Sequence, residues 1–183
     1  MGIVRRQRGK GTTLVRPPIP EQLPHLVGLT EELEARGSVV RTDVLSAGWV
    51  TPSPLVKQAL RLAGGSQQVL LLVRCRHIDG EPVFYVREYI PAWLGLTPDD
   101  DFTGSLFALM RERAGVVVAR AEMTIGAVAA QGQVAACLQV PVGSPLLRNE
   151  RVFYGADNSH LGFLEEWCRS DRYMHAVTLK AGG

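Results

Sequence analysis

Apolar residues recur along this chain with the spacings of helices and strands, and turn-forming residues separate the segments. The pattern predicts helices at 30–36, 53–62 and 105–113 and strands at 39–50, 68–78 and 82–90. Thr30 is expected to be the N-cap of the first helix, which Gly37 ends. Asp79-Gly80, between two of the strands, is a strong signal for a hairpin turn.

The order of these elements recurs after a constant shift of 78 residues, which matches Gly37 with Gly115 and Glu88 with Glu166. We therefore interpret the chain as two α-β-α-β-β units that form an α+β fold. One antiparallel sheet of about six strands would be covered by helices. Similar local preferences arising independently in the two halves would also produce such matches. A seam between two packed units is a common place for a small molecule to bind.

The chain has 183 residues, 46% of them hydrophobic and 21% charged, which suits one globular domain or a domain with an appendage. Cys75, Cys137 and Cys168 share no C-x-x-C spacing. This argues against a disulfide framework or a zinc ribbon and favours a reducing compartment. No apolar run is long enough for a membrane span, and no secretory signal pattern follows the basic N-terminus. We therefore expect a cytoplasmic protein.

Positive charge is concentrated at the N-terminus. Residues 1–16 hold five of the 20 basic residues and no acid, so the rest of the chain has 15 bases against 18 acids. Two β-prone runs flank a Gly-Lys-Gly tip, which is the composition of a two-stranded turn. Such a segment could neutralise the backbone charge of an anionic partner such as nucleic acid. A solvated basic tail is the alternative interpretation.

Prolines crowd the segment that follows. Residues 17–24 contain four prolines, which disfavour helices and inner strands and favour extended chain. We expect a semi-rigid linker here. The expected organisation is therefore a basic segment at 1–16, a linker at 17–24 and a globular body at 25–183.

Arg74 and Arg76 are the clearest candidates for binding chemistry. They share one face of a predicted strand that is otherwise apolar, and a buried guanidinium needs an acceptor. They could clamp a carboxylate or phosphate, or they could pair with a protein carboxylate such as Glu88. Ser105 could hold an oxyanion at the start of its helix or only cap that helix. Phe107 is expected in the core or in a pocket wall.

Enzyme signatures are missing from the sequence. The four histidines show no ligand spacing, and no nucleophile elbow, phosphate loop or dinucleotide fingerprint occurs. Nothing points to a pair of catalytic carboxylates. We therefore predict a protein that is not an enzyme and that binds no metal and no cofactor.

Taken in order, the motifs resemble the HutC subfamily of GntR-type bacterial transcription regulators, and the body is similar to their UTRA effector-binding domain. No single motif decides this, but the ordered set covers essentially the whole chain. The residues that carry the resemblance are Arg5-Arg6-Gln7-Arg8-Gly9-Lys10-Gly11-Thr12, Leu29-Thr30-Glu31-Glu32-Leu33, Arg36-Gly37, Arg74-Cys75-Arg76, Asp79-Gly80-Glu81-Pro82, Ser105-Leu106-Phe107 and Arg169-Ser170-Asp171-Arg172-Tyr173.

The resemblance implies a chorismate-lyase-like fold and a homodimeric regulator, usually a repressor, that leaves DNA when a small metabolite binds. It also implies that the basic segment is the second half of the wing of a winged helix-turn-helix. The helices that precede such a wing are missing from this chain, so we expect weak, salt-sensitive DNA binding without major-groove readout. The residues expected to contact DNA are Arg5, Arg6, Arg8, Gly9, Lys10, Gly11 and Thr12.

The resemblance also assigns an effector site, formed by Arg74, Arg76, Glu88, Ser105 and Phe107. Phe107 stands where many members have tyrosine, and Val86 stands where members that bind phosphorylated amino sugars tend to have glutamate. Glu88 projects to the same face two residues later, and Gly162 occupies a position that is acidic in those members. Fewer polar partners weaken recognition of a sugar with many hydroxyl groups. We therefore expect a less hydroxylated, anionic effector.

Two alternatives to this interpretation remain. The chain could be a small enzyme on a chorismate-lyase-like fold, a chemistry that also relies on arginine and glutamate. It could also be a truncated dimerisation partner of a full-length regulator. The basic N-terminal segment favours the regulator, because an enzyme has no need of it.

Overall fold

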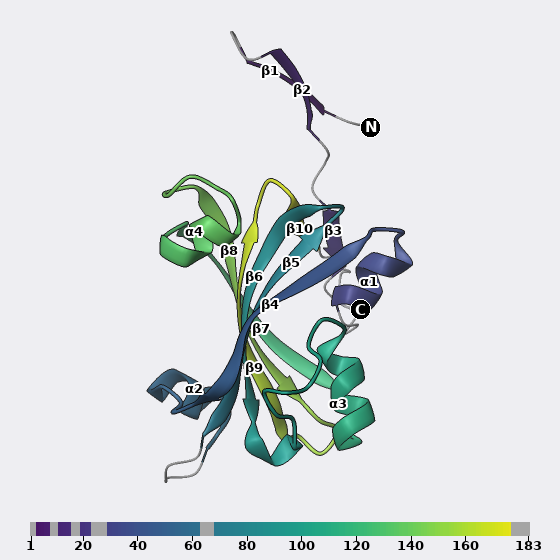
Figure 1. Ribbon diagram of the computed structural model, residues 1–183, viewed down its shortest axis with the longest axis vertical. Helices are drawn as coiled ribbons and strands as arrows, with labels where there is room; N and C mark the ends of the chain where they lie inside the picture. Colours follow the sequence, from purple (N-terminus) through teal and green to yellow (C-terminus); the bar gives the residue numbers. More distant parts are fainter. Residues whose placement is uncertain (1–2, 8–10, 16–18, 23–28, 63–67, 177–183) are drawn as a thin grey trace, which may run out of the picture.

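The computed structural model describes residues 3–7, 11–15, 19–22, 29–62 and 68–176. Its main feature is an antiparallel sheet with the strand order β4-β5-β6-β9-β8-β7 (Figure 1). The strands are β4 (Val40–Val50), β5 (Val69–Ile78), β6 (Glu81–Pro91), β7 (Arg120–Ala129), β8 (Pro145–Tyr154) and β9 (His160–Arg169). The predicted α+β fold with about six strands is confirmed.

The helices complete two similar units. They are α1 (Leu29–Ala35), α2 (Pro54–Ala59), the 3₁₀ turn η1 (Ala92–Leu94), α3 (Leu106–Ala114) and α4 (Gly132–Cys137). Each half runs helix, strand, helix, strand, strand, which confirms the predicted repeat. The last strands of the two units, β6 and β9, pair at the centre of the sheet. None of the described helices is long and apolar enough to cross a membrane.

Turn chemistry fixes the ends of several elements. Asp79 and Gly80 have φ of 51° and 85° between β5 and β6, as the predicted hairpin turn requires. Gly115 ends α3 in the left-handed region, with φ of 67°. Ser53 caps α2 by accepting a hydrogen bond from the Val56 N–H.

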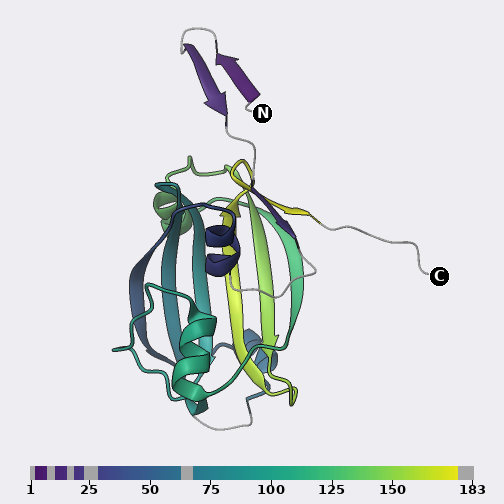
Figure 2. The same ribbon diagram turned by 90° about the vertical axis from the view of Figure 1, so that its right-hand side faces the viewer.

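Helices cover both faces of the sheet. We call the face that carries Arg74, Val86 and Glu166 the inner face, because these residues stand opposite one another in the strand register. α1 and α3 lie in front of this face (Figure 2), and Leu33 and Met110 join them to the main hydrophobic core. α2 and α4 pack on the other, outer face in two smaller cores.

The basic N-terminal segment forms a two-stranded hairpin. β1 (Ile3–Gln7) pairs antiparallel with β2 (Gly11–Val15), as the composition predicted. The hairpin projects beyond one end of the main sheet (Figure 1). Its tip, with the candidate DNA contacts Arg8, Gly9 and Lys10, lies outside the described residues.

The linker prediction for residues 17–24 is wrong in part. Residues 19–22 form β3 (Ile19–Gln22), which pairs in parallel with β10 (Tyr173–Ala176). Proline is compatible with an edge strand, where one side of the backbone needs no partner. Pro20, opposite Met174, therefore does not prevent the pairing. The segment between the β1–β2 hairpin and α1 is therefore hydrogen-bonded, through β3, to the strand β10 that follows the main sheet.

Two helix limits also differ from the prediction. α1 begins at Leu29, so Thr30 lies inside the helix and is not its N-cap. α2 ends at Ala59 and not near residue 62, because Arg61 adopts a left-handed φ of 48° that no helix continues. The predicted strands of the first unit match the observed ones to within one or two residues.

Candidate functional site

Arg74 is a fully buried structural residue of the inner face. Its Nε donates to Glu88 Oε2 at 2.9 Å, and its Nη2 donates to Glu88 Oε1 at 2.7 Å. Its Nη1 donates to the carbonyl oxygens of Phe102 and Gly104 at 3.0 and 3.2 Å. Of the two alternatives for Arg74, the geometry therefore favours pairing with Glu88. The guanidinium also anchors the loop that leads into α3.

Arg76 has the opposite character, although it points to the same face. It is 6% exposed, yet its nearest acidic atom, Glu88 Oε1, lies 3.9 Å from its Nη2. Its buried Nε has no hydrogen-bond partner. Burial, and then the positive charge of Arg74, lower the pKa of Arg76 to about 10, so it keeps its charge at neutral pH. Arg76 therefore has donor capacity to spare for an anion.

Ser105 links two helices. As the N-cap of α3, its hydroxyl accepts from the Ala108 N–H at 3.2 Å, and the same hydroxyl donates to Glu31 Oε1 at 2.6 Å. The capping role predicted for Ser105 is present. The bond to Glu31, on α1, is an addition that the sequence did not indicate. We call this Glu31–Ser105 contact the helix clasp.

Phe107, on α3, is a partly buried residue that packs against the main hydrophobic core. It packs edge-on against Phe153, with ring centroids 5.1 Å apart and an interplanar angle of 83°. Both rings belong to the main core under α3. Of the two roles expected for Phe107, the structure thus shows a place in the core.

Sequence reasoning missed several polar residues of the inner face. Glu166 stands on β9 opposite Val86, and Asn149 stands on β8 opposite Glu166. Asn149 is 0% exposed, and its Nδ2 donates to Glu166 Oε1 at 2.8 Å. The repeat held a signal for Glu166, because the shift of 78 residues matches it with Glu88. Asn149 had no such signal, since only strand pairing brings it here.

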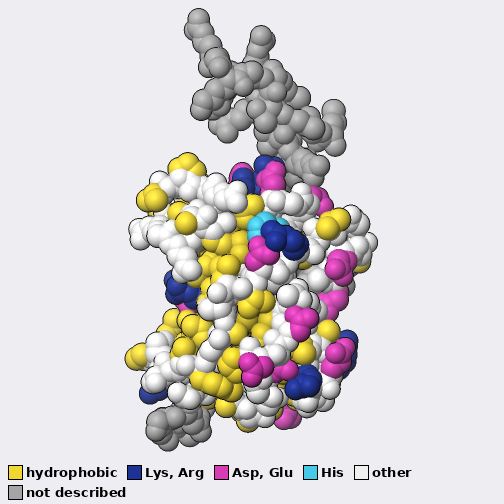
Figure 3. All heavy atoms as spheres, in the orientation of Figure 1, with side chains coloured by type: hydrophobic (Ala, Val, Ile, Leu, Met, Phe, Trp, Pro, Cys, Tyr) yellow, Lys and Arg dark blue, Asp and Glu magenta, His cyan; other side chains and the backbone are white. Residues whose placement is uncertain are grey.

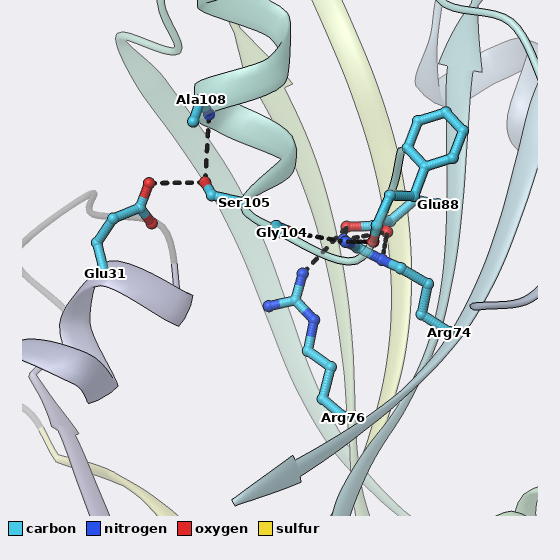
Figure 4. A network of polar contacts seen from close by, with 8 residues as sticks. Glu31, Arg74, Arg76, Glu88, Gly104, Ser105 and Ala108 are labelled. Carbon is cyan, nitrogen blue, oxygen red and sulfur yellow. Dashed lines mark hydrogen bonds and ion pairs between the residues drawn. The ribbon is translucent and has the colours of Figure 1, made fainter. Parts of the chain in front are cut away.

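Figure 4 shows the side chain of Arg76 with Glu31 of α1 on one side of it and Glu88 of β6 on the other. The carboxylates of Glu88, Glu166 and Glu31 each act on its charge. No group of three or more His, Cys, Asp or Glu residues in the described part of the chain is arranged to hold a metal. The arrangement is suited to binding a polar molecule by hydrogen bonds and charge.

The outer face has a hollow of its own, lined in part by an arginine whose contacts differ from those of Arg76. The hollow has a volume of about 470 Å³ and lies beside α4, next to Arg148 and Trp167. The Arg148 Nη2 already contacts Glu150 at 2.6 Å and Glu165 at 2.8 Å, and its side chain is 32% exposed. Figure 3 shows hydrophobic side chains, in yellow, on the surface between α4 and α2. These two carboxylates pair with the Nη2 of Arg148, although its Nε is also buried without a partner. Arg76 is only 6% exposed, and its ion pair with Glu88 is longer, at 3.9 Å, so the inner face is the stronger candidate.

Comparison with known families identifies the fold. The UTRA domain matches residues 35–174, which is more than half of the chain. This chain belongs to the UTRA domain family. The matched part of the UTRA domain runs from the end of α1 into β10 and contains the whole six-stranded sheet. The predicted resemblance to UTRA domains is confirmed.

The relatives of this UTRA domain are named as transcription regulators. HTH-type transcriptional regulator Rv0792c of Mycobacterium tuberculosis is 32% identical over 182 residues, which make up 97% of this chain and 66% of that protein. HTH-type transcriptional repressor NagR of Bacillus subtilis is 22% identical over 173 residues, 94% of this chain and 71% of that protein. The chain thus spans slightly less than two thirds of the Mycobacterium tuberculosis regulator.

A solved structure agrees with these relatives. The crystal structure of the effector domain of PhnF from Mycobacterium smegmatis superposes with a TM-score of 0.82 at 25% identity. The match covers 89% of this chain and 100% of that one. The two relatives from Mycobacterium tuberculosis and Bacillus subtilis are named as transcription regulators, which leaves the alternative of a small enzyme without support.

Two of the three departures noted in the sequence, Val86 and Gly162, lie on the inner face of the UTRA domain. Val86 is buried between Arg74 and Glu166 in the strand register and belongs to the main core. A Cβ at Gly162 would lie 3.5 Å from the Phe153 ring and 3.9 Å from Met110. Val86 thus supplies no polar group between Arg74 and Glu166. The surroundings of Gly162 are apolar except for the Tyr89 carbonyl oxygen, 3.6 Å from such a Cβ.

Proposed function

We propose that this UTRA domain is the sensor of a cytoplasmic, homodimeric GntR-type repressor of the HutC subfamily. An anionic metabolite bound on the inner face controls whether the regulator holds DNA. The observation that carries the proposal is Arg76, a buried guanidinium whose Nε has no partner in the protein. Buried polar groups nearly always have partners, so an unpaired one marks a place for a ligand.

The effector site consists of Arg76 with Ser105, Glu88 and Phe107 around it, and Arg74 acts through Glu88. Because Arg74 occupies both oxygens of Glu88, that carboxylate is held in place and cannot fully neutralise Arg76. An anion that binds Arg76 therefore supplies the acceptor that its Nε lacks in the protein. The partly buried ring of Phe107 would offer such an effector an apolar surface, which suits a ligand with few hydroxyl groups.

The helix clasp offers a route from the effector to DNA. A ligand on Arg76 lies next to Glu31, and Glu31 is the residue that ties α1 to α3 through Ser105. A ligand that competes with Ser105 for the Glu31 carboxylate weakens the contact between α1 and α3. α1 follows β3 in the chain, and β3 follows the basic hairpin, so a change at α1 reaches the DNA-contacting segment along the backbone.

We propose that residues 1–16 contact DNA as a wing and that residues 25–183 form the sensor. Residues 17–24 connect the two, partly as strand β3. The contacts are expected from Arg5, Arg6, Arg8, Gly9, Lys10, Gly11 and Thr12. Arginine and lysine in such a segment bind phosphates without reading the sequence, so sequence selection needs a recognition helix elsewhere in the regulator.

A thermal-shift panel of organic acids, sugar phosphates and neutral sugars tests the sensor. At least one anion should raise the melting temperature by several degrees, because a ligand that binds only the folded state stabilises it. Arg76→Met should abolish this shift, whereas Arg41→Met, which removes an exposed arginine of β4, should keep it. Strong stabilisation by a neutral sugar without any response to acids would contradict the proposal.

A further inference from the structure

Two of the three cysteines meet where α4 packs on the outer face of the sheet. Cys75 lies on β5 next to Arg74 and therefore points to the opposite, outer face, and Cys137 is the last residue of α4. The Cys75 Sγ lies 3.8 Å from the carbonyl oxygen of Cys137, and the two thiols hydrogen-bond to each other. Cys168 is apart from them, in the main core on the inner face. The fold thus brings together the sulfur atoms of two residues 62 positions apart.

The hydrogen bond between the two thiols favours ionisation of Cys75. The bond donated by the Cys137 thiol lowers the pKa of Cys75, although burial and the charge of Asp43 act in the opposite direction; Arg41 adds a smaller lowering. The same bond, followed by burial, raises the pKa of Cys137, whose proton it holds. Cys75 is therefore the first of the pair to become a thiolate, which is the nucleophilic form of cysteine.

The pair lies close to solvent, although Cys75 itself is only 3% exposed. Cys137 is partly exposed at the end of its helix. Asp43 stands opposite Cys75 on the edge strand β4, and its side chain is 38% exposed. Oxidation of cysteine depends on thiolate character and on access. Cys75 supplies the first and Cys137 the second, so the pair is placed to react with a small oxidant such as hydrogen peroxide.

We propose that Cys75 and Cys137 form a reversible disulfide on exposure to hydrogen peroxide. The Cys75 thiolate attacks one peroxide oxygen and the O–O bond breaks, which leaves a sulfenic acid on Cys75. The departing hydroxide takes the proton of Cys137 and becomes water. The Cys137 thiolate then attacks the Cys75 sulfur, the S–O bond breaks and hydroxide leaves. One peroxide is thus reduced while the two cysteines are oxidised to one disulfide.

The disulfide would join the two halves of the fold. Cys137 ends α4 of the second unit, whereas Cys75 belongs to β5 of the first unit. Closing so long a loop restricts the unfolded chain and thereby stabilises the folded one. The oxidised protein should therefore melt several degrees higher than the reduced protein. In a reducing compartment such bonds are typically transient and respond to oxidants.

Treatment of the full chain with hydrogen peroxide tests the proposal. Free thiols are counted with a chromogenic thiol reagent after denaturation, and the count should fall from three to one. Peptide mapping by mass spectrometry should find Cys75 linked to Cys137 within one chain, and dithiothreitol should restore all the thiols. Retention of all three thiols, a link that includes Cys168, or links only between two chains would overturn the proposal.

Alanine variants assign the two sulfur atoms. Cys137→Ala removes the partly exposed member of the pair, so it should abolish both the link within the chain and the rise in melting temperature on oxidation. Cys75→Ala should give the same result. Cys168→Ala is the matched control and should keep both effects. A Cys137→Ala variant whose melting temperature still rises as much as that of the wild type would also overturn the proposal.

Discussion

Arg74 and Arg76 are chemically identical side chains, two positions apart on β5, that do different work. Arg74 gives its donors to Glu88 and to the carbonyl oxygens of Phe102 and Gly104. Arg76 reaches Glu88 only at 3.9 Å and keeps Nε unpaired. The strand period predicted that both side chains would share a face. Which of them would be satisfied depended on Glu88 and on a loop about 30 residues away in the sequence.

Replacing Arg74 should destabilise the fold strongly. Arg74→Met leaves the Glu88 carboxylate buried without its partner, which typically costs about 3–5 kcal/mol in the free energy of unfolding. The double variant Arg74→Met with Glu88→Leu should recover part of this loss, because it removes the unpaired charge. Urea denaturation measures both. A double variant that is less stable than the single one would contradict the argument.

His77 should make stability depend on pH. It is 8% exposed on β5, and burial, followed by the positive charge of Arg41, lowers its pKa despite a contact of 3.5 Å with Asp43. The pKa is lower in the folded than in the unfolded chain, where it is about 6.5. Protons therefore bind the unfolded chain more readily, and stability falls as the pH drops below about 6.5.

The comparison that checks this uses His77→Gln. Urea denaturation of the wild type and of the variant, each at pH 7.5 and at pH 5.5, gives the loss of stability on acidification. The loss should be smaller in the variant, because glutamine does not titrate. Carboxylates titrate in both proteins and cancel in the comparison. An equal loss in the two proteins would show that His77 does not contribute.

At the scale of elements, a serine caps the N-terminus of one helix in each unit, but only one of the two serines also contacts a second helix. Ser53 caps α2 by accepting from Val56 N–H at 3.3 Å, and Ser105 caps α3 by accepting from Ala108 N–H. Only Ser105 also donates to a second element, through Glu31 of α1. The same local signal thus makes a plain cap in one unit and an interhelical contact in the other.

Serine-to-alanine variants should separate these two roles. Ser53→Ala removes only a cap and should lower the free energy of unfolding by about 1 kcal/mol. Ser105→Ala removes a cap and leaves the Glu31 carboxylate without a donor, so its loss should be larger by about 1–3 kcal/mol. Thermal or urea denaturation gives the difference. Equal losses would show that the helix clasp contributes nothing to stability.

At the scale of the whole molecule, the basic charge and the sensor occupy separate parts of the chain. In the hairpin, β1 and β2 pair with each other. The buried charged side chains lie on strands of the six-stranded sheet. β3 lies between the hairpin and this sheet in the chain order and pairs with β10, which follows the last strand of the sheet. Substitutions that remove positive charge from the hairpin should therefore weaken DNA binding without lowering the stability of the core.

Neutralising the hairpin should remove salt-dependent DNA binding. If four basic side chains contact phosphates, the logarithm of the association constant should fall with the logarithm of salt concentration with a slope of about −4. Replacing Arg5, Arg6, Arg8 and Lys10 by glutamine should remove this binding and leave the melting temperature unchanged. The control variant, with the same replacement at Lys57, Arg61, Arg111 and Arg113, removes equal charge from exposed positions of the body. Fluorescence anisotropy measures both, and equal losses would contradict the assignment.

The sequence alone determined the elements of this protein and their order. Turn residues such as Asp79-Gly80, apolar periodicity and a shift of 78 residues act locally or repeat, so they indicate the two units and the six strands. The strand period and a helix start singled out Arg76 and Ser105 as candidates, and the family resemblance then assigned both to an effector site. Prolines in 17–24 misled, because their local preference for extended chain does not show whether that chain pairs with β10.

Only the tertiary structure decided which buried polar and charged groups pair with one another. Glu31, on α1, reaches Ser105 across 74 positions, and Asn149 meets Glu166 because β8 pairs with β9 in one register. Hydrogen bonding between side chains depends on ångström distances, and no local pattern carries those. The pairing of Arg74 and the unpartnered Nε of Arg76 therefore appear only once the helices lie on the sheet.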